Sequence, residues 1–104
     1  MTTRSTTKPT LRQILAGLLE QARARPTVSV SFNLSHGLGL HLKIDTSGHL
    51  HLGISRFQSS PSLLEWNTVC DAARLPRLPA RESEKDERYY LWAEFELPEQ
   101  EKLL

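Results

Sequence analysis

The sequence is poor in cysteine, in aromatic residues and in long apolar segments. Cys70 is the single cysteine, which excludes an internal disulfide and favours a reducing, cytoplasmic location. No apolar stretch approaches the ~20 residues needed to cross a bilayer, so we expect no membrane partner. Apolar residues make up only 38% of the 104 residues, and this length and composition predict one domain with a modest core.

Motifs that would indicate an enzyme are also missing. Gly37, Gly39, Gly48 and Gly53 fall in predicted turns and strands rather than in a phosphate-binding loop that leads into a helix. No serine or cysteine lies in a nucleophile motif, and no pair of carboxylates indicates acid–base catalysis. Cys70 lies on the apolar stripe of a predicted helix, which is typical of a buried structural thiol. We therefore predict a protein that is not an enzyme and uses no cofactor.

What the sequence does contain is a strict alternation of apolar and polar residues across 28–55. The apolar members are Val28, Val30, Phe32, Leu34, Leu38, Leu40, Leu42, Ile44, Leu50, Leu52 and Ile54. The positions between them are small or polar. A period of two predicts an antiparallel meander of three strands with one apolar and one polar face.

The face parity also predicts the turns. Leu34 and Leu38 must share a face, as must Ile44 and Leu50, and this excludes two-residue loops. Three-residue loops that end in Gly37 and Gly48 satisfy the parity, because a type I turn followed by a left-handed residue favours glycine. The predicted cross-strand pairs are Val30 with Leu42, Phe32 with Leu40, Leu40 with Ile54, and Leu42 with Leu52.

Helices are predicted on both sides of the meander, at 11–25 and 61–73. Thr10 and Gln13 form a capping box before the first, and Ser60 precedes a proline at the start of the second. The strand before it should stop or bulge near Arg56, where a charge falls on the apolar parity.

The remaining segments complete the predicted organisation. Residues 74–87 are predicted as a mobile linker, and alternation over 88–97 predicts a fourth strand at an edge of the sheet. Residues 1–9 and 99–104 are predicted tails around a single domain at 10–98. The predicted fold is thus a two-layer α+β sandwich in the order α-β-β-β-α-β, with both helices on one face.

Charge is distributed unevenly along the chain, although the net charge is only +1. Residues 1–81 carry ten basic and four acidic side chains, a net of +6, whereas residues 82–104 carry three basic and eight acidic ones, a net of −5. A basic body indicates a nucleic-acid surface, or else the two regions neutralise each other. The basic residues that we expect to contact nucleic acid are Lys43, Arg56, Arg74, Arg77 and Arg81.

Two aromatic residues favour a protein partner instead. Tyr90 and Trp92 share the polar parity of the fourth strand, and large exposed aromatics are frequent interface anchors. A free edge strand could also pair with a second copy to form a homodimer.

Three histidines on the polar face were weighed as metal ligands. His49 and His51 share a face, with His41 diagonal to His51 and Asp45 at the corner near His49. Zinc needs three or four ligands within tetrahedral reach. No further ligand is evident from the sequence, so we predict no metal site and interpret these histidines as solvent-facing.

The order helix, three strands, helix resembles that of double-stranded RNA-binding domains over residues 10–74. The resemblance is one of topology, because the basic cluster at the start of the second helix is missing here and a strand is added. We therefore predict a small, non-catalytic binding module for nucleic acid, with a protein-binding adaptor or inhibitor as the alternative.

Overall fold

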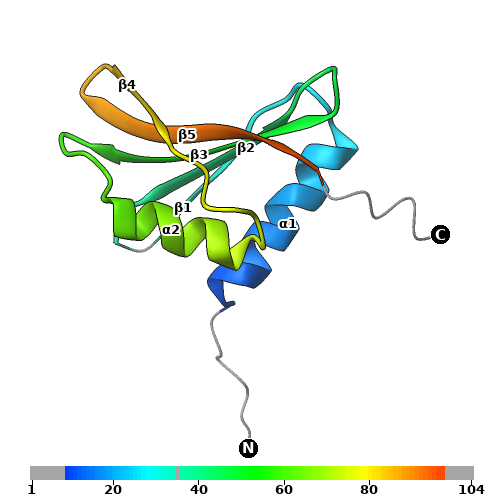
Figure 1. The fold of residues 1–104 in the computed structure, drawn as a ribbon, viewed down its shortest axis with the longest axis horizontal. Coiled ribbons are helices and arrows are strands. Elements are labelled where there is room, and N and C mark those ends of the chain that lie inside the picture. The colour runs from blue at the N-terminus through cyan, green and yellow to red at the C-terminus, as the bar shows by residue number, and fades with distance from the viewer. Residues whose placement is uncertain (1–8, 35, 98–104) are drawn as a thin grey trace, which may run out of the picture.

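The computed structural model describes residues 9–34 and 36–97, and within them the chain forms two helices and a five-stranded antiparallel sheet (Figure 1). The elements are α1 (Leu11–Ala24), β1 (Val30–Asn33), β2 (Gly39–Ile44), β3 (His49–Phe57), α2 (Leu63–Ala72), β4 (Arg81–Lys85) and β5 (Arg88–Glu96). Both helices lie on one side of the sheet, which confirms the predicted α+β sandwich. The predicted tails, apart from Pro9, lie outside the described residues.

The register of the meander is the predicted one. Val30 pairs with Leu42 and Phe32 with Leu40, while Leu40 pairs with Ile54 and Leu42 with Leu52. Gly37 and Gly48 have φ angles of 90° and 86°, in the left-handed region that favours glycine. Their N–H groups donate to the carbonyls of Leu34 and Asp45 at 3.0 and 2.9 Å, which closes both turns.

The inward side chains of the strands and helices form one core. Its buried apolar residues are Leu15, Leu18, Ala22, Leu38, Leu40, Leu42, Ile44, Leu50, Leu52, Ile54, Trp66, Val69, Cys70, Leu75, Leu91, Ala93 and Phe95. Cys70 is fully buried, and burial raises the pKa of its thiol to about 11. The thiol is therefore protonated at neutral pH, in agreement with a structural role.

The helix starts follow the sequence in one case and depart from it in the other. At α1, the Thr10 hydroxyl accepts from the Gln13 N–H and the Gln13 side chain accepts from the Thr10 N–H, so the predicted capping box is confirmed. At α2, the cap is Ser62 rather than Ser60. Ser62 exchanges the same two hydrogen bonds with Glu65, and this second capping box moves the helix start beyond the proline.

The segment that was predicted as a mobile linker is largely ordered. Leu75 is buried, and the Trp66 indole donates to the Leu78 carbonyl at 2.9 Å. Arg81–Lys85 then forms β4, a fifth strand that pairs with β5. The prediction missed it because all of its residues are charged or polar and fully exposed, so it carries no alternation.

The turn between β4 and β5 lacked a sequence signal as well. Asp86 and Glu87 have φ angles of 53° and 65°, the conformation of a type I′ turn, which usually contains glycine or asparagine. The order of strands is β1-β2-β3-β5-β4, so β5 lies inside the sheet and the predicted edge position is wrong. β3 also continues past Arg56 to Phe57, because Phe57 pairs with Arg88 of β5.

Two glycine substitutions separate turn strain from helix propensity. We expect Gly48→Ala to lower the free energy of unfolding by about 1 kcal/mol, since alanine is strained at positive φ. Gly17 lies inside α1, and a Cβ there would meet no atom within 4 Å. Gly17→Ala should therefore raise stability by up to ~1 kcal/mol. Urea unfolding of both variants provides the measurement. If the two substitutions changed the free energy of unfolding in the same direction, the turn assignment would be contradicted.

Candidate functional site

The face of the sheet opposite the helices carries an ordered set of polar and aromatic side chains. Both described helices lie on the other side of the sheet, so no helix in residues 9–34 and 36–97 covers this outer face (Figure 1). One row of cross-strand neighbours crosses all five strands of the described sheet. It consists of Ser31, His41, Gly53, Trp92 and Arg81.

Trp92 lies at the middle of this face, against Gly53. A Cβ built on Gly53 would stand 3.2 Å from the Trp92 Cβ, tighter than an ordinary contact, so glycine allows the close approach of the two strands. The Arg81 guanidinium lies over the indole, 5.0 Å from the ring centroid, in a cation–π contact. Trp92 is thereby held between two strands while its side chain stays partly exposed.

A chain of hydrogen bonds joins four strands beside Trp92. Arg88 donates to the Ser55 hydroxyl at 3.0 Å, and Ser55 Oγ lies 2.7 Å from His41 Nε2. His41 Nδ1 in turn lies 2.9 Å from Ser31 Oγ. Arginine can only donate, so the Ser55 hydroxyl oxygen accepts from Arg88, and its own proton is free to be donated to His41 Nε2; in that tautomer Nδ1–H donates to Ser31.

His41, at the centre of this chain, is partly buried and contacts the Tyr90 ring. Burial lowers the pKa of His41, and the charge of Arg88 lowers it further, so a neutral imidazole is favoured. The imidazole lies 5.6 Å from the Tyr90 ring, centroid to centroid. Although Ser55 and His41 have the spacing of a nucleophile and its base, Ser55 has no exposed surface and cannot meet a substrate.

A hollow on this face is lined by the basic residues Lys43 and Lys85 and by the acidic residue Glu84. The hollow has a volume of about 610 Å³ and is lined by His41, Lys43, His51, Lys85, Tyr90 and Trp92, among others. By their register, Arg81 and Arg88 belong to the same face. The outer face thus combines two aromatic rings with four permanent cations.

The five basic residues that were expected to contact nucleic acid do not lie on one surface of the structure. Lys43 and Arg81 lie on the outer face, whereas Arg77 forms an ion pair with Asp71, with a nitrogen–oxygen distance of 2.6 Å. Arg74 follows α2 on the helical side, where it lines a groove with Ala73 and other residues. The remaining cation of the five, Arg56, has the inward parity of β3.

Tyr90 and Trp92 do occupy the outer face, as predicted, and both are partly buried. The functional candidates that sequence reasoning missed are Lys85 and Arg88. They lie in the acidic segment 82–104, whose net charge concealed them. Alternation along the β4–β5 hairpin could have identified them, because Lys85 and Arg88 share a face with Tyr90 once β4 is recognised.

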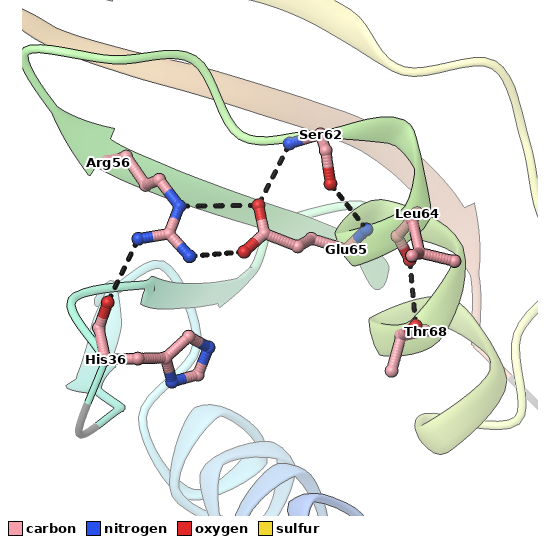
Figure 2. Close-up of polar contacts among 6 residues, drawn as sticks. All are labelled: His36, Arg56, Ser62, Leu64, Glu65 and Thr68. Carbon is pink, nitrogen blue, oxygen red and sulfur yellow. Dashed lines mark hydrogen bonds and ion pairs between the residues drawn. The ribbon is translucent and has the colours of Figure 1, made fainter.

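Arg56 joins three parts of the fold on the helical side. Its guanidinium forms a two-point ion pair with Glu65 of α2 and donates to the His36 carbonyl at 3.0 Å (Figure 2). This contact holds the pKa of the Glu65 carboxyl at about 2. Arg56 therefore ties the end of β3 to the start of α2 and to the β1–β2 turn.

An apolar groove lies beside this ion pair. It has a volume of about 630 Å³ and is lined by residues of α1, α2 and the β1–β2 hairpin, including Leu11, Ile14, Phe32 and Leu64. Phe32 is 43% exposed and Leu64 is 76% exposed, values that are high for large apolar side chains. Figure 2 shows Leu64 on α2, one residue before Glu65.

The end of the outer face away from Arg88 carries histidines and carboxylates. Asp45 Oδ2 lies 2.9 Å from His51 Nε2, and His49 Nδ1 lies 3.2 Å from Glu94 Oε2. Hydrogen bonds from the His51 side chain and the His49 N–H hold the pKa of Asp45 at about 2. Glu94 comes from β5 and could not be assigned to this corner before the pairing of β5 with β3 was known.

Comparisons with known proteins add no functional assignment to this geometry. Protein-family models, curated proteins and solved structures all gave no match to the chain. Among the described residues, no helix has the length and apolar character needed to cross a membrane. The outer face and the apolar groove are therefore the two candidate binding surfaces.

The ion pair between Arg56 and Glu65 gives a pH-dependent contribution to stability that can be measured. Glu65→Gln keeps the capping oxygen but removes the charge, so we expect a loss of about 1 to 2 kcal/mol at pH 7. Because the folded pKa of Glu65, about 2, lies below its ordinary 4.5, this contribution is complete above pH 5 and disappears as the pH falls toward 2.

Urea unfolding of both proteins between pH 7 and pH 2 tests this expectation. The stability difference between wild type and Glu65→Gln should shrink steadily below pH 5. A difference that stays constant over this range would show that the charge of Glu65 is not what stabilises the contact.

Proposed function

We propose that the outer face of the sheet binds single-stranded nucleic acid. The observation that carries the proposal is Trp92, partly exposed on an open sheet face with the Arg81 guanidinium stacked over its ring. Aromatic rings on a sheet stack with unpaired bases, and an arginine plane extends such a platform. Tyr90 lies on the same face of β5, two residues away, and offers a second ring.

The charges around the rings favour the same ligand. Arg81, Lys85 and Arg88 lie on the outer face near the β4–β5 hairpin, and Lys43 lines the same hollow from β2, where it pairs with His51. Cations on this face can neutralise backbone phosphates. Glu94 and Glu96 lie at the opposite end of β5, where they would repel phosphate. A bound strand is therefore expected to follow the half of the face nearest the β4–β5 hairpin.

Single strands are favoured over duplexes because stacking requires bases that are free of their own neighbours. The hollow of about 610 Å³ beside Tyr90 and Trp92 gives an unpaired base room to approach the rings. This proposal keeps Lys43 and Arg81 from the basic set of the sequence analysis. Arg56 and Arg77 support it less, since both are held in ion pairs with carboxylates.

Replacing the central ring tests the stacking. We expect Trp92→Leu to weaken binding of fluorescein-labelled oligo(dT) and oligo(U) by about 5- to 100-fold, because leucine covers Gly53 but cannot stack. Fluorescence anisotropy at low salt measures the affinity. The matched control is Tyr89→Leu, an aromatic on the same strand that faces the helical side and is 37% exposed. Equal losses in both variants, or no binding by wild type, would reject the proposal.

Two double variants with the same change in charge test the electrostatic part. In a plot of log affinity against log salt concentration, binding to phosphates gives a negative slope. We expect the double variant Lys43→Ala with Lys85→Ala to make this slope less steep by about 1.4, which is about 0.7 for each lost phosphate contact. Arg74→Ala with Arg77→Ala removes the same charge from the helical side and should leave that slope unchanged. If both double variants changed the slope equally, the slope would depend only on net charge, and the outer face would not be the binding surface.

A protein-binding module is the second candidate, and the apolar groove favours it. The groove beside Phe32 and Leu64 is large and apolar, as expected for a surface that receives apolar side chains from a partner. Self-association through the groove can be tested with the purified protein alone, without a second protein. If the groove is used in this way, sedimentation should show a concentration-dependent dimer that Leu64→Ser abolishes without lowering the melting temperature. A wild-type protein that stays monomeric would remove support for a homodimer.

A further inference from the structure

Four side chains from two strands and one turn converge at the carboxylate end of the outer face. Asp45 is the first residue of the β2–β3 turn, His49 and His51 lie on β3, and Glu94 lies on β5. One ligand atom from each of Asp45, His49 and Glu94 lies within 4.8 Å of the other two. His51 stands directly beside them and hydrogen-bonds Asp45 Oδ2 at 2.9 Å.

The spacing of these atoms fits a small metal ion. Zinc binds imidazole nitrogen and carboxylate oxygen at about 2.0 to 2.2 Å, so two tetrahedral ligands stand about 3.3 to 3.6 Å apart. The distance from His49 Nδ1 to Glu94 Oε2 is 3.2 Å, close to such an edge. Asp45 offers the third atom within 4.8 Å, a separation that a rotation of the exposed Glu94 side chain can shorten.

The backbone orders one of these ligands in advance. Asp45 Oδ1 accepts the N–H groups of Ser47 and His49 at 2.9 and 3.0 Å, which fixes the carboxylate over the turn. Its second oxygen is oriented by His51, in the way that outer partners hold the ligands of metal sites. His49 and Glu94 are about 40% exposed, so an ion can enter from solvent.

We propose that Asp45, His49 and Glu94 form a zinc-binding site and that His51 positions Asp45 within it. Imidazole distinguishes zinc from magnesium and calcium, which prefer oxygen ligands throughout. Three protein ligands leave a fourth position for water or for an exchangeable ligand. This site does not depend on nucleic-acid binding, because its three ligands, Asp45, His49 and Glu94, are not among the side chains proposed to contact nucleic acid.

Isothermal titration of the full chain with zinc chloride, in a buffer that does not bind metal, tests the site. We expect one zinc ion per chain and no measurable heat from magnesium chloride. His49→Asn and Glu94→Gln should each weaken zinc binding by more than 10-fold. His51→Gln should weaken it by about 10- to 100-fold, as expected for a positioning residue. His36→Gln, which removes a histidine near the β1–β2 turn, should leave the affinity unchanged.

Thermal melting separates metal binding from folding. Zinc should raise the melting temperature of wild type but not that of His49→Asn, while the melting temperatures of both without zinc should be similar. The proposal is overturned if zinc does not bind. It is equally overturned if Glu94→Gln leaves the affinity intact, or if His36→Gln lowers it as much as His49→Asn does. In those cases the two histidine–carboxylate contacts are hydrogen-bonded pairs that hold no metal ion.

Discussion

Burial of one face of the sheet is the constraint on which the rest of the structure depends. Alternation sends Leu40, Leu52 and Ile54 to the side where none of them retains exposed surface. The apolar stripes of α1 and α2 cover that side, and Trp66 of α2 is 1% exposed. Because both described helices are used there, the polar parity of every strand is left on a surface that no described helix covers (Figure 1). The ion pair of Arg56 with Glu65 then fixes α2 at the end of β3.

A sheet face without a covering layer must be organised by its own side chains. The hydrogen-bonded chain through Arg88, Ser55, His41 and Ser31 performs this role across four strands. This hydrogen-bonded chain also requires a glycine at position 39, because a Cβ there would stand 2.8 Å from the Ser55 hydroxyl oxygen. The consequence is a surface whose aromatic rings are already oriented, which lowers the ordering entropy that a bound ligand would otherwise cost.

The outer face is divided along its length by chemistry. Arg81, Lys85, Arg88 and both rings lie toward the β4–β5 hairpin, whereas Asp45, Glu94 and two histidines lie at the other end, where Lys43 pairs with His51. We propose phosphates and unpaired bases as ligands of the hairpin half and a metal ion as the ligand of the other half. His51 borders both regions, because it lines the hollow and hydrogen-bonds Asp45. The proposed metal ligands Asp45, His49 and Glu94 are not among the side chains proposed to contact nucleic acid, so variants at these three positions test the metal site separately.

The sequence alone determined the meander, its register, both glycine turns and the side of β5 on which Tyr90 and Trp92 lie. These features depend on residues a few positions apart, whose parity and turn geometry leave one solution. The tertiary structure alone decided which strands became neighbours. Pairing of β5 with β3 brings Glu94 to Asp45 and His49, and the charged β4 brings Lys85 and Arg81 beside the rings. Arg56 likewise stays in β3 because Glu65 reaches it from α2. Such contacts join residues far apart in the chain, and no local periodicity encodes them.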